Sequence, residues 1–281
     1  MGVPDCLHGA VDLHVHSSPD VDRRRFDDIE LAREAARAGM GAVLIKSHQN
    51  STVERAALVS KIVPGIRVFG GLVLNQTVGG LNPAAVHLAL KMGARQIWMP
   101  TRDALNHRRH FQQSGGITVF DQDGKLSGAV EEILQAIAQS ECILGTGHLS
   151  PEETFALVER ASGLGVRRIL ITHPEWGPTL HSCAMQRKLA SFPAVMFERC
   201  FVSTTHLCGF VPFETIEEAI GDVGVGRTIL STDLGQPETP PPVEGLRLYA
   251  ERLRASGFSA DDVRQMMLSN PARLLSLETS L

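Results

Sequence analysis

Short apolar runs alternate along the chain with longer segments in which apolar residues recur every three or four positions. The runs are rich in Val, Ile and Leu and predict strands at 10–16, 41–48, 67–75, 95–103, 142–148, 167–173, 194–200 and 227–233. Several are almost continuously hydrophobic, as is typical of parallel strands that helices cover. The order of the segments therefore predicts strand–helix units built around a parallel sheet.

The segments between the runs carry helix signals. The capping-box residues Ser150 and Glu153 open one of them. Helices are predicted at 27–41, 82–94, 127–139, 150–165, 181–191, 212–221, 243–255 and 260–268. Eight strand–helix units, with no GxGxxG sequence after the first strand, favour a closed (β/α)8 TIM barrel over an open dinucleotide-binding sheet. We expect one α/β domain over residues 1–281.

Composition narrows the partners and the compartment. A net charge of −4 gives no electrostatic reason to expect nucleic acid or an anionic membrane as a partner, and a small-molecule substrate fits better. The chain shows no signal-peptide core and no apolar run of membrane-spanning length, so we expect a cytoplasmic protein. Its five cysteines lack CxxC spacing, which fits reduced thiols rather than disulfides. The sequence leaves the oligomeric state open, a homo-oligomer included.

Residue types that bind metals stand repeatedly at the ends of the predicted strands, which is where barrels carry their function. They are His14, His16, Lys46, His48, His148, His173, Glu198 and Asp233. Residues two apart on a strand face the same side, so His14 and His16 are expected to point together into the barrel mouth. A single strand histidine is more often structural, but this combination predicts a site for Zn²⁺, Mn²⁺ or Fe²⁺.

Such a site has a direct use in hydrolysis. A bound divalent ion lowers the pKa of water from about 15.7 to roughly 7 and so supplies hydroxide at neutral pH. A neighbouring aspartate can take up the proton and pass it to a leaving group. The residues at the strand ends are therefore suited to activating a water molecule with the help of a metal.

The HxH pair on the first strand, His148, His173 and Asp233 on later strands, and the ending "NPARLLSL" at 270–277 resemble the amidohydrolase superfamily, in its compact one-domain branch. The likeness extends from the first strand to this ending. It implies one or two divalent ions, with zinc expected first, and a small amide, lactone or ester attacked by metal-bound hydroxide. In that family His14 and His16 would bind one ion together with Asp233, which would also shuttle the proton. His148 and His173 would bind a second ion or contact the substrate.

One position departs from the family pattern. Two-metal members carry a bridging carbamylated lysine or a glutamate on the fourth strand, where this chain has "WMPTRDALNH". Lys46 or Glu198 could replace it, with His48 as an additional ligand, or the site could hold one ion; Glu198 could instead orient a ligand histidine. Arg102 is expected to bind a substrate carboxylate or phosphate. The long segment 104–126 is expected to act as a lid.

Three rival interpretations remain. "DLHVHSSPD" also resembles the opening motif of PHP-type phosphoesterases, which would place Ser17 and Asp20 in a three-metal site. Those proteins end with an Asp-x-His pair, whereas Gly235 follows Asp233 here at that spacing. The same barrel could also house a metal-dependent decarboxylase or lyase. Outside enzymology, it could be a metal-binding barrel without catalysis.

Overall fold

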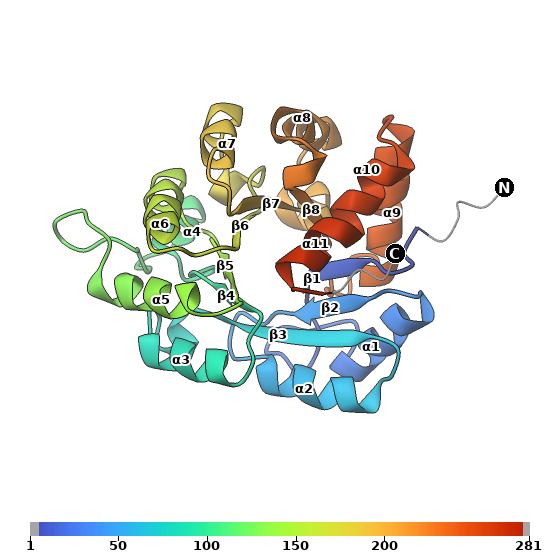
Figure 1. Ribbon diagram of the computed structural model, residues 1–281, viewed down its shortest axis with the longest axis horizontal. Helices are drawn as coiled ribbons and strands as arrows, with labels where there is room; N and C mark the ends of the chain where they lie inside the picture. The colour runs from blue at the N-terminus through green and yellow to red at the C-terminus, as the bar shows by residue number, and fades with distance from the viewer. Residues whose placement is uncertain (1–5, 278–281) are drawn as a thin grey trace.

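Eight parallel strands pair in chain order and form a nearly closed barrel (Figure 1). The strands are β1 (Val11–Val15), β2 (Ala42–Ile45), β3 (Arg67–Val73), β4 (Gln96–Trp98), β5 (Ile143–Gly145), β6 (Ile169–Thr172), β7 (Val195–Cys200) and β8 (Thr228–Ser231). The computed structural model describes residues 6–277, so residues 1–5 and 278–281 of the expected domain lie outside the described part. The predicted (β/α)8 TIM barrel is confirmed, with every strand shorter than predicted.

Hydrogen bonds of backbone and side chain close the seam between β1 and β8. The Asp233 amide donates to the His14 carbonyl at 2.7 Å, and the His16 amide donates to the Leu234 carbonyl at 2.8 Å. The buried Asp12 carboxylate also spans this seam, because it accepts from the backbone amides of His14 and Thr232, both at 3.1 Å. The ends of β1 and β8 are therefore fixed to each other, which matters because both carry candidate ligands.

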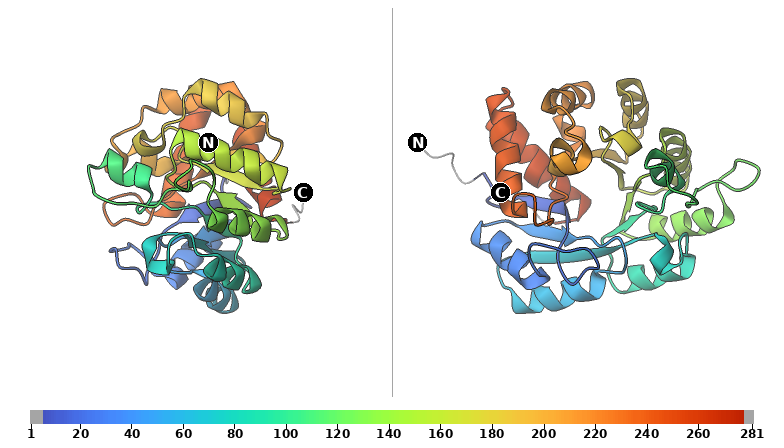
Figure 2. Two further views of the ribbon diagram at one scale, coloured as in Figure 1. Left: turned by 90° about the vertical axis from the view of Figure 1, so that its left-hand side faces the viewer. Right: turned by 180° about the vertical axis from the view of Figure 1, so that it is seen from behind.

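Helices lie outside the strands in all views (Figure 2). They are α1 (Asp28–Arg37), α2 (Val53–Ile62), α3 (Pro83–Lys91), α4 (Leu105–His110), α5 (Gly128–Ala138), α6 (Pro151–Gly163), α7 (Cys183–Ala190), α8 (Phe213–Val223), α9 (Pro242–Ala255), α10 (Ala260–Arg264) and α11 (Asn270–Leu274). Each predicted helix is present. The sequence did not indicate α2, whose first residue follows Thr52 without a side-chain cap, nor the short α4 inside the segment expected as a lid.

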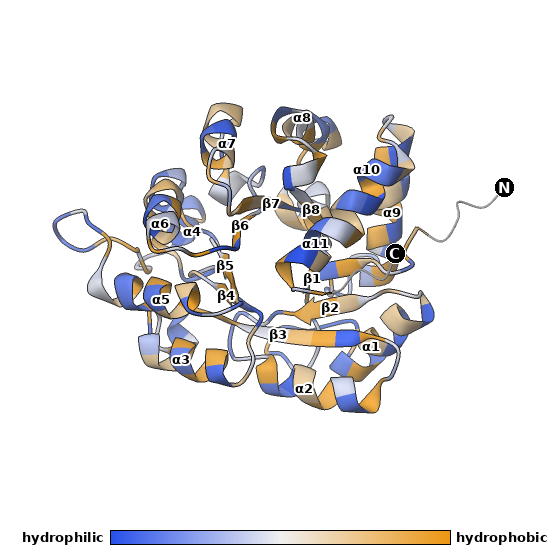
Figure 3. Cartoon of the chain, viewed as in Figure 1, coloured by the Kyte–Doolittle hydropathy of each residue, from blue (hydrophilic) through white to orange (hydrophobic). Residues whose placement is uncertain are grey.

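Apolar packing is divided between the barrel interior and the layer under the helices. Trp98 is the largest side chain of the interior cluster, which Leu274 and Leu275 from the chain's end complete. Asn270 of the "NPARLLSL" ending is buried and donates to the carbonyls of Val225 and Thr228, which fixes α11 at the start of β8. The surrounding helices show both polar and apolar patches, as helices with one buried face do (Figure 3).

Across residues 6–277, no helix combines the length and the apolar character that crossing a membrane requires.

Candidate metal centre

A local irregularity in β1 turns His14 toward the barrel mouth. Val11 and Leu13 pack in the barrel interior, so simple alternation would point residue 14 outward. The register between β1 and β2 shifts between Asp12 and Val15, and such a shift re-aims the following side chains. His14 and His16 consequently face the same carboxylate. The sequence indicated the pair, but alternation alone could not reveal the shift.

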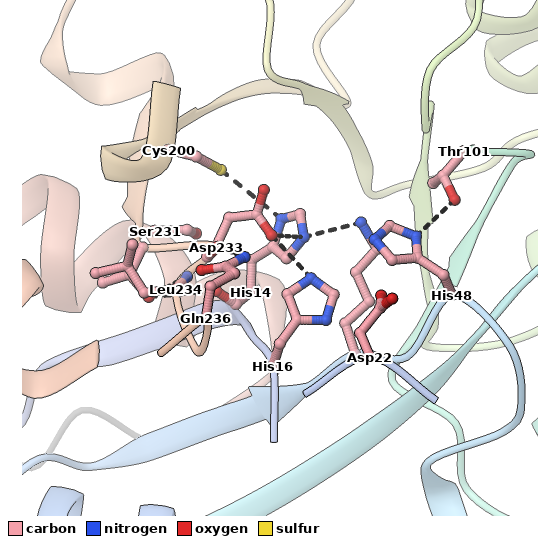
Figure 4. A network of polar contacts seen from close by, with 12 residues as sticks. His14, His16, Asp22, His48, Thr101, Cys200, Ser231, Asp233, Leu234 and Gln236 are labelled. Carbon is pink, nitrogen blue, oxygen red and sulfur yellow. Dashed lines mark hydrogen bonds and ion pairs between the residues drawn. The ribbon is translucent and has the colours of Figure 1, made fainter. Parts of the chain in front are cut away.

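Asp233 is the centre of this cluster (Figure 4). Its Oδ1 lies 2.9 Å from the Nε2 atoms of both His14 and His16, and its Oδ2 lies 3.3 Å from Nε2 of His173. Asp233 and His173 both have left-handed backbone conformations, with φ of 51° and 50°. That conformation costs a non-glycine residue about 1 kcal/mol or more and is concentrated at functional sites. Strands β1, β6 and β8 thus bring three imidazoles to one carboxylate.

Glu198 determines which nitrogen of His14 carries the proton. Its Oε2 lies 3.2 Å from His14 Nδ1, while its Oε1 accepts a hydrogen bond from Ser231 at 3.0 Å. Because an ionised carboxylate only accepts, Nδ1 carries a proton toward Glu198, which leaves Nε2 as the nitrogen available to a metal. Nε2 faces Asp233 Oδ1 at 2.9 Å, so a proton held there is the one that a metal would displace. This is the arrangement by which a carboxylate prepares a histidine for a metal, so the geometry fits the orienting alternative for Glu198.

Lys46 reaches the same centre from the end of β2. It is 1% exposed, which excludes a surface lysine, and its Nζ lies 2.8 Å from His14 Nε2. The ammonium also lies 5.4 Å from the centroid of the Trp98 ring. Burial lowers the pKa of Lys46, although Asp233 and Glu198 act in the opposite direction. The neutral amine, the form needed for a carbamate, is therefore more accessible here than at a surface.

The protonation states of the cluster suit a cation. Burial lowers the pKa of His16 well below its ordinary value and that of His173 to about 3, so both rings are neutral at physiological pH. Burial alone would raise the pKa of Asp233, but His14, His16 and His173 hold it well below its usual range. Neutral His16 and His173 beside an ionised carboxylate are the forms that coordinate a divalent ion, whereas His14, whose pKa burial lowers but Asp233 and Glu198 raise above 6.5, would release a proton on binding. The residues present therefore fit a metal.

Cys200 is a neighbour that the sequence did not single out. Ligand atoms of His14, His173, Cys200 and Asp233 all lie within 4.8 Å of one another. Burial, together with Glu198 and Asp233, raises the pKa of the Cys200 thiol well above 9, which keeps it protonated without a metal. Its signal was available: Cys200 ends β7 two residues after Glu198 and so shares its face. It was not selected because the cysteines were judged only by their lack of CxxC spacing.

The opposite wall holds histidines with different partners. His48 Nδ1 lies 2.8 Å from the Thr101 hydroxyl, which also accepts from Asn75 Nδ2 at 2.8 Å. With the Thr101 hydroxyl donating to Nδ1, the His48 proton lies on Nε2. His48 thereby becomes a hydrogen-bond donor toward the pocket. That tautomer does not fit the role of an Nε2 metal ligand.

His148 pairs with a histidine of α4. Its Nδ1 lies 2.9 Å from Nδ1 of His107, and the two rings stack with centroids 4.8 Å apart. Burial lowers the pKa of His107 to about 4 and that of His148 well below its ordinary value, so one neutral ring donates to the other. Gly147 precedes His148 with φ +60°, where a Cβ would lie 2.3 Å from the Met99 carbonyl. His148 lines the pocket without contacting Asp233 in this arrangement.

These residues surround a cavity of about 450 Å³. His16, His48, His148, His173, Asp233 and Arg102 line it together with residues of α4 and the loops after β6 and β7. Arg102 lies at the rim, half-exposed, where its guanidinium forms a 2.6 Å ion pair with Asp22. Part of the expected lid, the segment 104–126, forms α4, whose His107 and following Phe111 face the cavity. A substrate carboxylate would have to share Arg102 with Asp22.

The residues that suggested a phosphoesterase, Ser17 and Asp20, have partners outside the cluster around Asp233. The Ser17 hydroxyl donates to Asp28 at 2.6 Å, and Asp20 pairs with Arg24 at 3.2 Å. Gly235 has φ +140°, and a Cβ there would lie 2.0 Å from the carbonyl oxygen of His16. A histidine at position 235 is thus incompatible with this backbone. The geometry therefore favours the cluster of three histidines around Asp233 over a three-metal site that includes Ser17 and Asp20.

Comparisons with known proteins agree with the barrel. A sequence model of a family of unknown function, DUF6282, matches residues 9–198. No curated protein sequence matches the chain. Among solved structures, an amidohydrolase from Pseudomonas aeruginosa shares 13% identity over 96% of both chains, with a TM-score of 0.64. An organophosphorus hydrolase from Deinococcus radiodurans shares 16% identity, over 97% of this chain and 94% of that one, with a TM-score of 0.60. The expected likeness to amidohydrolases is confirmed for the fold.

Proposed function

The chain belongs to DUF6282, a family of unknown function, and we propose that this member is a metal-dependent hydrolase of the amidohydrolase type. Its substrate would be a small amide, lactone or ester. The observation that carries the proposal is the contact of Asp233 with the Nε2 atoms of three histidines, at 2.9, 2.9 and 3.3 Å. Structurally similar proteins that are named as hydrolases support the reaction class.

The residues assigned to a first ion are His14, His16, His173 and Asp233. When bound, a divalent ion such as Zn²⁺ would supply the Lewis acidity that activates water and polarises a carbonyl. A second ion would require Lys46, after carbamylation, or His148. Zinc is the first choice because imidazole nitrogens dominate the set, with Mn²⁺ and Fe²⁺ as alternatives.

The chain's own groups would divide the work of hydrolysis. Asp233 is ionised and lines the pocket, with its side chain 15% exposed, so it can accept the proton of the attacking water and return it to the leaving group. His48 would donate Nε2–H to the substrate oxygen, since its Nδ1 faces Thr101. Arg102 would hold a carboxylate at the rim in competition with Asp22.

Turnover by the metal-loaded full chain tests this function. We expect it to hydrolyse members of a panel of small amides, lactones and esters, and Asp233→Asn to lower kcat by about 10²- to 10⁴-fold while part of the metal stays bound. Asp222→Asn serves as the matched control, because Asp222 is a surface carboxylate paired with Arg187. Full activity in Asp233→Asn would refute the proton-transfer role. A metal-filled protein that turns over no member of the panel would refute the hydrolase.

A further inference from the structure

A second cavity, of about 540 Å³, adjoins the pocket of the metal centre. Phe111, Trp176, Leu207 and Cys208 line both cavities, so the two depressions share one wall. We call this second cavity the apolar groove. Its wall residues come from the segments that follow β4, β6 and β7, which are the loops that normally determine specificity in a barrel.

Large apolar side chains are unusually exposed along this groove. Phe111, Leu180, Leu207 and Phe210 are 48%, 56%, 41% and 64% exposed. They come from three separate loops but face one cavity, whereas the other exposed large apolar residues do not line it, namely Val21, Leu58, Ile62, Leu88, Met92 and Leu248. Isolated exposed apolar residues need no explanation, but a contiguous concave set indicates a binding surface.

The groove offers no free carboxylate among the described residues that line it. Glu175, the acidic residue there, forms a buried ion pair with Arg199 and accepts from Gln186 at 3.1 Å. Burial raises the pKa of the Cys208 thiol to about 12, so this group is uncharged. An occupant of the groove would therefore meet mostly apolar side chains, with His110 and Thr215 as the other polar side chains of the lining, and would find no free carboxylate to pair with. This favours a neutral, apolar group.

Trp176 connects the groove to the metal centre. Its ring centroid lies 5.1 Å from that of His148 and 5.6 Å from that of His173. One indole therefore contacts the polar centre and also lines the groove. A single molecule can place a polar group at Asp233 and extend an apolar arm past Trp176. This continuity favours a substrate arm over a second copy of the chain as the occupant.

We propose that the apolar groove binds a neutral, apolar acyl arm of the substrate, and that the substrate class is therefore amides, lactones or esters with such an arm. The assignment of the scissile group rests on the proposed hydrolase function. The groove itself rests on Phe111, Leu180, Leu207 and Phe210, which lie outside the candidate ligand set.

A series of p-nitrophenyl esters with two-, four-, six- and eight-carbon acyl chains tests the groove with the zinc-loaded full chain. We expect kcat/KM to rise about two- to fourfold for each added methylene until the groove is filled. Leu180→Ser and Phe210→Ser should flatten this dependence, because they lower kcat/KM most for the eight-carbon ester and least for the acetate ester. Leu88→Ser is the matched control, because Leu88 is 59% exposed on α3, and should keep the slope. If kcat/KM of the unaltered protein did not change with acyl-chain length although the acetate ester was hydrolysed, the groove proposal would be overturned and the hydrolase proposal would stand.

Binding without metal separates the two proposals. The neutral fluorescent probe N-phenyl-1-naphthylamine should bind the metal-free chain, and Phe210→Ser should weaken its binding about tenfold or more. If the metal-free chain bound the probe but the zinc-loaded chain hydrolysed none of the esters, the groove would be supported and the hydrolase refuted. Light scattering measures the oligomeric state in the same experiment. If the unaltered chain were a dimer that does not bind the probe, and Phe210→Ser converted it to monomers that also do not bind the probe, a second copy would cover this face. That result would overturn the proposal.

Discussion

The two walls of the pocket use the same residue type in opposite surroundings. On the β1, β6 and β8 side, imidazoles face the charged Asp233, and Glu198 holds the far nitrogen of His14. On the β2 and β5 side, His48 and His148 bond to the uncharged groups of Thr101 and His107. A histidine's chemistry follows from what its two nitrogens meet. We therefore expect the first wall to hold metal and the second to donate protons or hydrogen bonds.

Removing one histidine from each wall has the largest expected effect on this comparison. His14→Ala should lower zinc affinity by more than about 100-fold, because it deletes a ligand and leaves Glu198 Oε2 without its contact to Nδ1. His48→Ala should leave zinc content unchanged, since Nδ1 of His48 is used by Thr101. Elemental analysis after dialysis against a weak chelator measures both. Equal metal loss in the two variants would erase the distinction between the walls.

Glu198→Gln tests how the first wall prepares its ligand. The substitution keeps the volume but removes the charge that faces His14 Nδ1 at 3.2 Å. We expect a 10- to 100-fold loss of zinc affinity, the usual effect of losing such an orienting carboxylate. Competition with a fluorescent zinc chelator measures it, and Glu218→Gln is the control, because Glu218 is exposed on α8. Unchanged affinity would mean that Glu198 does not orient the ring.

A change of pH should alter zinc affinity less than the substitutions above, and the change should come from His14 in the first wall. Burial lowers the pKa of His14, yet Asp233 and Glu198 raise it to a net value above 6.5. In the metal-free protein His14 is therefore protonated below that pKa, and zinc must displace one proton. Affinity should rise about tenfold per pH unit between pH 5.5 and 6.5. Calorimetry in two buffers of different ionisation enthalpy reports the released proton. Its absence would contradict a protonated His14.

The same shifts have opposite consequences for folding stability. The raised pKa of His14 contributes stability that is present below 6.5 and is lost as the pH rises through its folded value. His107, with its pKa lowered to about 4, works in reverse: the unfolded chain takes up a proton below 6.5, so stability falls as the pH drops toward 4. Zinc bound at His14 should abolish the first effect, because His14 then no longer titrates, and should leave the effect of His107 in place.

The sequence indicated the barrel and the strand-end residues because their signals are local. Parallel strands are hydrophobic runs, and functional side chains follow them directly. The partners that assign a role to each histidine are distant: Glu198 lies 184 residues from His14, and Thr101 lies 53 from His48. Their pairing follows from strand order and from the register shift in β1, which no local pattern encodes. Cys200 differs, because its place two residues after Glu198 on β7 was a local signal, and only its lack of CxxC spacing set it aside.

Thr101→Val gives the smallest expected effect and the sharpest test of the second wall. It removes the hydroxyl that faces His48 Nδ1 at 2.8 Å and that accepts from Asn75. Losing two buried hydrogen bonds should cost about 1–3 kcal/mol in the free energy of unfolding, measured by urea denaturation. Zinc content should not change, because His48 takes no part in the first wall. If the variant lost zinc while staying folded, the tautomer argument would fail, and His48 would have to be counted among the ligands.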